Sequence, residues 1–227
     1  MEFKYILIKN LTMKFFFISS FIILYSANLF AQQESKAGQI LDEVSKKYKA
    51  IPSFKAGFSI LRESPNSGKS NETDNGEITV KGSKFHLKLK DQEIYNNSAK
   101  VWTYLKTSNE VTINNYSPDD DELNPTKIFT IYKKGFKYTL AGEEKEAGQV
   151  YEVIDLSPEK AKNQQVYKIK LTINKKDRSL KRWRVFEKNG NRYTYTITNF
   201  TPVTLEDKDF VFDKTKYKGV EEVALDN

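Results

Sequence analysis

Side chains that commonly carry catalysis are scarce in this sequence. His86 is the single histidine among 227 residues, and there is no cysteine. The absence of cysteine removes disulfides, thiolate nucleophiles and cysteine metal sites together. One histidine is also too few for a zinc site, which normally needs several His or Cys ligands. Since no glycine-rich phosphate loop is present either, the sequence predicts no catalytic residue, no metal and no cofactor.

Two polar features are candidate functional sites, but the sequence favours a structural explanation for each. His86 stands in "KFHLKL", on the opposite face of a predicted strand from Phe85 and Leu87, which predicts a solvent-exposed ring. The acidic run "PDDDE" at 118–122 lacks the spacing of a calcium loop and precedes a predicted helix start, where negative charge is favourable. Catalytic carboxylates pair in space, which spacing does not reveal, but nothing nominates a pair. We therefore expect a protein that is not an enzyme.

Aromatic residues are the unusual part of the composition, with 15 Phe, 13 Tyr and 2 Trp. Many occupy alternate positions of strand-like segments, as in the stretch 76–105, where apolar and polar residues take turns. Alternation of this kind gives a sheet one apolar face. In a curled sheet, such a face either fills a packed core or lines a cavity for a ligand.

Short connections join the predicted strands, which implies antiparallel neighbours. A sheet this long must curl to bury its apolar face. The stretch 62–76, rich in Gly, Ser and Asn, predicts a loop, and 210–212 is a candidate edge strand. The alternation predicts about eleven strands, at 53–61, 77–81, 84–90, 92–95, 101–106, 110–115, 136–140, 150–156, 167–173, 180–187 and 191–201.

Two short helices are expected to cover the mouth of the curled sheet. The first spans 39–49 and has apolar residues at helical spacing. The second spans 125–134, with Asn124 as N-cap, Pro125 at the first helical position and Gly135 as the stop. Their apolar faces carry Ile40, Leu41, Val44 and Tyr48 in the first helix and Ile128, Phe129 and Tyr132 in the second.

The N-terminus has the pattern of a secretory signal peptide, with a basic start, an apolar run and small residues before Ala31. The run is about 11 residues long, short of the ~20 that span a bilayer, which favours cleavage over an uncleaved anchor. We expect a signal peptide at 1–31, a single domain at 32–227 and a periplasmic location. Met1 and Met13 both remain candidate starts.

The net charge of +7 does not indicate a nucleic-acid surface. The lysines stand singly at alternate strand positions, as in "YKIKLTINKK", and no nucleic-acid motif is present. A solvated sheet face explains this pattern better, and a weak attraction to anionic membrane surfaces remains open.

The order of the segments "SFKAGFSI", "GEITVKGSKFHLKL", "IYNNSAKVWTYLKTSNEVTI", "VYEVIDLSP" and "IKLTINKKDRSLKRWRV" resembles the periplasmic outer-membrane lipoprotein carrier family, LolA. The resemblance covers about 37–220. It implies a mainly β (α+β) fold, an open, curled antiparallel β-barrel with a short helical lid. It also implies a carrier that takes acylated lipoproteins from an inner-membrane ABC transporter to an acceptor at the outer membrane. A periplasmic lipid-sensing regulatory protein of the same fold is the alternative.

The resemblance implies that the apolar face lines a cavity for acyl chains. Phe85 and Trp102 match family positions, whereas Lys81 stands where the family often has an arginine linked to lid closure, so lid control falls to Lys81 or is lost. The candidate cavity residues are Phe54, Phe58, Ile60, Ile78, Val80, Phe85, Leu87, Trp102 and Tyr104. The candidate lid residues are Ile40, Val44, Ile128, Phe129 and Tyr132.

Overall fold

The computed structural model describes residues 35–65, 68, 70–117, 128–133, 135–160 and 165–224. The expected signal peptide and the acidic run at 118–122 lie outside the described residues. An α-helix covers residues 35–49, which confirms the first predicted helix and extends it toward the N-terminus. Among the described residues, no helix is long and apolar enough to cross a membrane.

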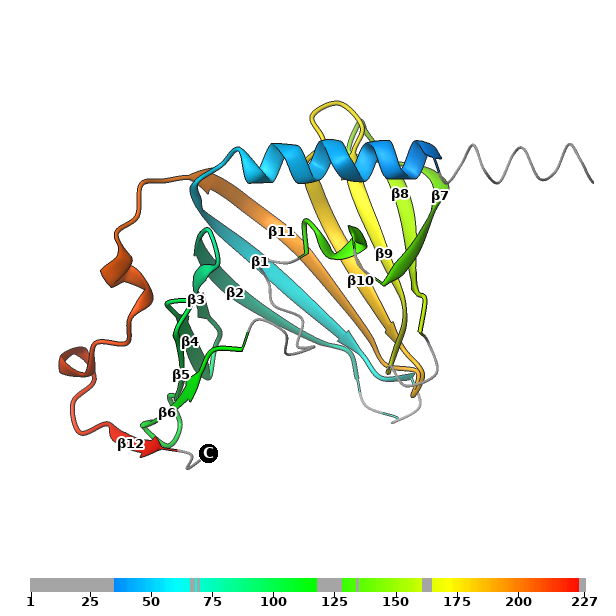
Figure 1. Cartoon of the computed structure of the whole chain (residues 1–227). Helices are drawn as coiled ribbons and strands as arrows, with labels where there is room; N and C mark the ends of the chain where they lie inside the picture. Colours follow the sequence, from blue (N-terminus) through cyan, green and yellow to red (C-terminus); the bar gives the residue numbers. More distant parts are fainter. Residues whose placement is uncertain are drawn as a thin grey trace, which may run out of the picture.

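The strands of the described chain form one curled, unclosed sheet of twelve strands (Figure 1). Their order is β12-β6-β5-β4-β3-β2-β1-β11-β10-β9-β8-β7, and all neighbours pair antiparallel except β12, which runs parallel to β6. The first six are β1 (Ser53–Glu63), β2 (Glu72–Lys81), β3 (Lys84–Lys88), β4 (Gln92–Asn96), β5 (Lys100–Leu105) and β6 (Glu110–Asn115). The others are β7 (Phe136–Glu146), β8 (Gln149–Pro158), β9 (Val166–Asn174), β10 (Leu180–Glu187), β11 (Arg192–Pro202) and β12 (Glu221–Ala224).

The predicted eleven antiparallel strands are all present, but the predicted loop at 62–76 is shorter than expected and lies between Glu63 and Glu72. β1 continues to Glu63 and β2 already begins at Glu72, so that Arg62 stands opposite Glu72. An ion pair between Arg62 and Asp74 joins the two strands. Local composition favours a turn here, but pairing with the long β1 extends the ladder into the polar stretch.

One face of the sheet, called here the inner face, meets the helix. Two adjoining apolar clusters cover it. One packs the helix against β8, β9 and β10, and the other joins β1, β2 and β3. In Figure 1 the helix (blue) lies across the ends of β8–β11, and the segment 128–133 (green) lies within the curl. Alternation along each strand supplies the apolar side chains of this face.

The second predicted helix is not an α-helix in its described part. Residues 128–130 form a turn, and Ile131–Lys133 form one 3₁₀ turn. Gly135 follows with φ +76°, a left-handed conformation that suits glycine and fits its predicted role as a stop. Ile128 and Tyr132 are buried, as their shared apolar face predicts.

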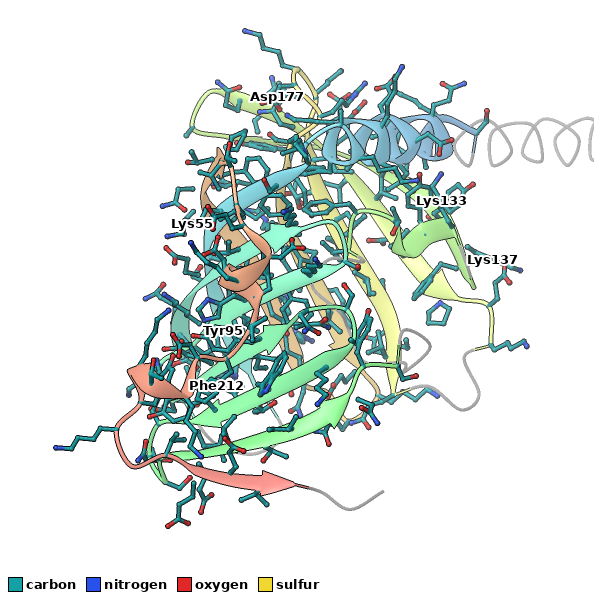
Figure 2. The ribbon with its side chains drawn as sticks, turned by 60° about the vertical axis from the view of Figure 1, so that its left-hand side comes forward. Lys55, Tyr95, Lys133, Lys137, Asp177 and Phe212 are labelled. Carbon is teal, nitrogen blue, oxygen red and sulfur yellow. The ribbon has the colours of Figure 1, made fainter. Side chains whose placement is uncertain are left out.

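The C-terminal segment, residues 203–224, crosses the other face of the sheet, called here the outer face. It contains 3₁₀ turns at Asp207–Phe210 and Lys214–Lys216 and ends in β12. Figure 2 shows this segment beside the sheet, with Phe212 near Tyr95. The predicted edge strand at 210–212 is wrong, because Phe210 is fully buried in a 3₁₀ turn.

Candidate functional site

The apolar half of the inner face is formed by β1, β2 and β3. Cross-strand register places Phe54, Val80 and Phe85 in one row. Gly76 stands opposite Phe58, and a Cβ there would lie 2.4 Å from the phenylalanine ring, so glycine makes room for that ring. Seven of the nine predicted cavity residues lie together here: Phe54, Phe58, Ile60, Ile78, Val80, Phe85 and, packed against them, Leu87.

Trp102 and Tyr104 lie on the outer face, so the expectation that they share the face of Phe85 is wrong. Trp102 stands opposite Tyr95, and Tyr104 packs against Phe212 with ring centroids 5.7 Å apart. The reason is that the outer face of β4–β6 is itself covered by the C-terminal segment, so an apolar side chain in these strands does not mark the inner face. These two residues belong to a separate aromatic cluster beneath the C-terminal segment.

The helix and the segment 128–133 cover the inner face together. Phe129 stacks on Tyr48 with ring centroids 3.7 Å apart and also meets the edge of Phe54 at 6.2 Å. The hydroxyl of Tyr132 donates a 2.8 Å hydrogen bond to Asp42 of the helix. This bond is the main cause of the lowered pKa of the Asp42 carboxyl. The five predicted lid residues are therefore brought into one cluster.

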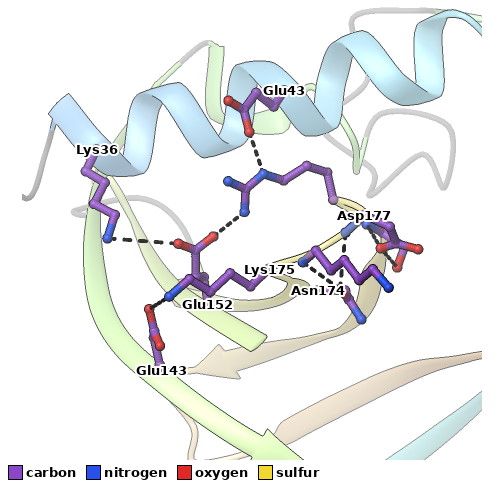
Figure 3. A network of polar contacts seen from close by, with 10 residues as sticks. Lys36, Glu43, Glu143, Glu152, Asn174, Lys175 and Asp177 are labelled. Carbon is purple, nitrogen blue, oxygen red and sulfur yellow. Dashed lines mark hydrogen bonds and ion pairs between the residues drawn. The ribbon is translucent and has the colours of Figure 1, made fainter. Parts of the chain in front are cut away.

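A buried ion-pair network ties the helix to the sheet (Figure 3). Glu152 of β8 is 1% exposed, and it pairs with Arg178 of the β9–β10 connection and with Lys36 at 4.0 Å. Arg178 also pairs with Glu43 of the helix, so one guanidinium bridges helix and sheet. Sequence reasoning missed this network, because nothing in the local pattern relates Glu43 to residues so distant in the chain.

Further contacts hold the last turn of the helix to the same connection. The ammonium group of Lys47 donates to the backbone oxygen of Asp177 at 2.7 Å. The backbone amide of Leu180 donates to the hydroxyl of Tyr48 at 3.1 Å. The helix is thus anchored to the β9–β10 end of the sheet along its length.

Lys81 contacts the C-terminal segment. Its ammonium group donates to Asp207 at 2.9 Å and to the backbone oxygen of Leu205 at 3.0 Å. Lys84 joins Asp207 at 2.7 Å, and the hydrogen bonds from Lys84 and Lys81 lower the pKa of the Asp207 carboxyl to about 2. Lys81 is therefore engaged away from the helix and the segment 128–133.

His86 is covered, so the expectation of a solvent-exposed ring is wrong. Its side chain is 11% exposed, stacks on Tyr95 at 3.8 Å and lies 3.0 Å from a carboxylate oxygen of Glu93. The hydroxyl of Tyr217 donates to the same oxygen at 3.2 Å. Burial lowers the pKa of His86, against an opposing effect of Glu93. The C-terminal segment covers the ring, and the pattern of the strand that contains His86 gives no information about that segment.

A groove of about 430 Å³ lies beside His86, between the outer face and the C-terminal segment. Lysine and acidic side chains line it together with Tyr95 and Tyr217. The described residues contain no group of three or more His, Asp or Glu side chains able to hold a metal ion. The groove is thus mainly polar, whereas the inner face carries two apolar clusters.

The profile of the outer membrane lipoprotein carrier protein LolA family matches residues 27–191, and the chain belongs to this family. The family is one of carrier proteins. No curated protein matches the sequence significantly.

The chain is similar to several solved structures. An uncharacterized conserved protein from Thermus thermophilus is 14% identical, with a TM-score of 0.57 and coverage of 84% of this chain and 99% of that one. A LolA superfamily protein from Nitrosomonas europaea is 13% identical, with a TM-score of 0.44 and coverage of 78% and 97%. The lipoprotein LppX from Mycobacterium tuberculosis is 13% identical, with a TM-score of 0.44 and coverage of 74% and 99%.

Proposed function

We propose that the chain is a periplasmic carrier that binds the acyl chains of lipoproteins on its inner face and shuttles them from the inner to the outer membrane. The observation that carries this proposal is the apolar inner face. The anchored helix covers its β8–β10 part, and Phe129 of the short segment 128–133 packs on its β1–β3 part. Membership of the carrier family supports it.

The free energy of exposing an acyl chain to water is large, and a carrier must offset it. Each methylene removed from water is worth ~0.8 kcal/mol, so a sixteen-carbon chain is worth about 12 kcal/mol. An acylated protein therefore needs a shield to cross an aqueous space. Phenylalanine and aliphatic side chains supply broad, non-directional contact. Contact of this kind shields a chain and still lets it leave, because no fixed hydrogen-bond pattern must be broken along the chain.

The remaining parts of the proposal follow from this role. The ligand is an acylated lipoprotein, the donor an inner-membrane lipoprotein-releasing ABC transporter, and the acceptor an outer-membrane protein or the membrane itself. The segment 1–31 serves as a cleaved signal peptide, so that the mature protein begins near Gln32. The covering segment 128–133 gives way when acyl chains enter.

The test is lipid binding by the purified mature protein. Mass spectrometry of the protein isolated from the periplasm is expected to find co-purifying acylated peptide or lipid. A fluorescent triacylated lipopeptide then measures affinity. Phe85→Glu is expected to weaken binding, because it places a charge among the apolar residues of the inner face. Leu87→Glu, at a less buried position of the same face, replaces it should Phe85→Glu not fold.

Val211→Glu is the matched control, since Val211 is 38% exposed and lines the outer groove. It adds the same charge to the other face and is expected to leave binding unchanged. If Val211→Glu alone lost binding, the binding site would be assigned to the outer groove instead. No binding of the lipopeptide by the wild-type protein would overturn the proposed function.

A further inference from the structure

The inner face contains a buried amide group without a partner. Asn96 ends β4, is 1% exposed and stands opposite Phe85 on one side and Val101 on the other, so its side chain shares the inner face with Phe85. Its Oδ1 accepts a hydrogen bond from the backbone amide of Ser98 at 2.7 Å. This bond fixes which side-chain atom is the oxygen. Among the described residues, Nδ2 has no hydrogen-bond acceptor.

Other buried polar atoms without hydrogen bonds differ from this one, because their groups have ionic partners. The Oδ1 of Asp155 lies 3.8 Å from the ammonium group of Lys170, and the guanidinium of Arg184 donates through Nη2 to Glu63. The Nδ2 of Asn96 has no such compensation within the described chain. Folded proteins keep few buried donors unsatisfied, because such a donor loses its water and gains nothing in return. A donor of this kind therefore calls for an acceptor that arrives with a ligand.

The inner face becomes polar next to Asn96. Cross-strand register places Ile94 of β4 opposite Thr103 of β5, and Thr103 opposite Thr112 of β6. It also places Val101 of β5 opposite Asn114 of β6. The three polar residues of this set, Thr103, Thr112 and Asn114, are half-buried. The face therefore has an apolar half over β1–β3 and a polar strip over β4–β6, with Asn96 at the boundary.

We propose that Asn96 Nδ2 donates a hydrogen bond to an acyl carbonyl oxygen of the bound lipid, the ester or amide group that joins a fatty chain to its head. This inference rests on the proposed function and extends it to the chemistry of the linkage. A carbonyl oxygen is an acceptor with two lone pairs, and in an acylated ligand it stands at the first carbon of the chain. Because neighbouring strands lie ~4.8 Å apart, a chain that begins at Asn96 reaches Phe85 at once. The head then lies over the polar strip.

The experiment compares two lipopeptide probes of equal chain length, one with ester-linked chains and one with ether-linked chains, which lack the carbonyl. Wild-type protein is expected to bind the ester probe about fivefold more tightly, as one net hydrogen bond predicts. Asn96→Asp keeps the acceptor for Ser98 and removes the amide donor, and its expected ester-to-ether ratio is near one. Asn115→Asp, which adds the same charge at an exposed position of β6 outside the inner face, is the matched control and is expected to keep the wild-type ratio.

The outcomes separate the two proposals. A wild-type protein that binds neither probe overturns the proposed function. Equal binding of both probes overturns the hydrogen bond of Asn96 and leaves the proposed function standing. If Asn96→Asp does not fold, the NMR chemical shift of the Asn96 side-chain amide in the wild-type protein tests the hydrogen bond instead. A shift with the ester probe alone supports the bond, and equal shifts with both probes overturn it.

Discussion

Replacement of Arg178 by methionine tests how the helix is held on the sheet. The side chain of Glu152 is 2% exposed, and Arg178 is its nearest cation. Removing one partner of a buried ion pair costs about 3–5 kcal/mol, because the other charge stays buried and uncompensated. Lys36 remains 4.0 Å from Glu152, and the Arg178 side chain is 27% exposed. We therefore expect Arg178→Met to lower the free energy of unfolding by about 3 kcal/mol, the lower end of that range.

A double variant separates the stranded charge from simple loss of packing. Arg178→Met combined with Glu152→Gln removes both charges, and we expect it to regain about 1–2 kcal/mol relative to the single variant. Arg178 has φ +61°, and methionine at this position carries a similar backbone strain, so strain cancels in the comparison. Arg182→Met is the matched control. Its guanidinium pairs with Glu144 and Glu146, whose side chains are each 43% exposed, and surface pairs are worth about 0–1 kcal/mol.

Urea unfolding at neutral pH measures these differences, and hydrogen exchange of residues 35–49 reports the helix separately. Exchange in the helix is expected to rise in Arg178→Met and to stay unchanged in Arg182→Met. A loss in Arg178→Met no larger than in the control would refute the argument. So would a double variant as unstable as the single one, because the stranded carboxylate would then not be the cause.

Three further predictions concern the covering segments. Bound lipopeptide is expected to change hydrogen exchange at 128–133, and equal protection with and without ligand would show a fixed plug. Stability is expected to fall as pH drops below 6.5, the ordinary pKa of histidine, because the lowered pKa of His86 favours the neutral ring in the folded state. In urea titrations His86→Gln should show a smaller loss between pH 7.5 and about 5.5, and an unchanged loss would assign the effect to other groups. Asp207→Asn removes the partner of Lys81 and Lys84 and is expected to raise exchange at 207–217 but not in β8–β10, whereas a rise in both regions would contradict a local role.

The sequence by itself predicted the class of fold and much of the inner face. Alternation within each segment identified the eleven antiparallel strands, because side chains on a strand point to opposite faces with a strict period of two. Within each strand the same rule correctly grouped Phe54 with Phe58, Ile78 with Val80, and Phe85 with Leu87 on one face. Helical spacing identified the buried side of the helix, including Leu41 and Tyr48. Each of these features depends on residues that are close together in the chain.

Only the tertiary structure decided how separate segments face one another. Trp102 lies on the outer face because the C-terminal segment covers apolar side chains there, and the same segment removes the expected exposure of His86. The pairing of Arg178 with Glu152, and the place of Asn96 at the edge of the apolar half, likewise depend on strand register. Register is set by the packing of the whole sheet, so the local pattern of amino acids does not predict it.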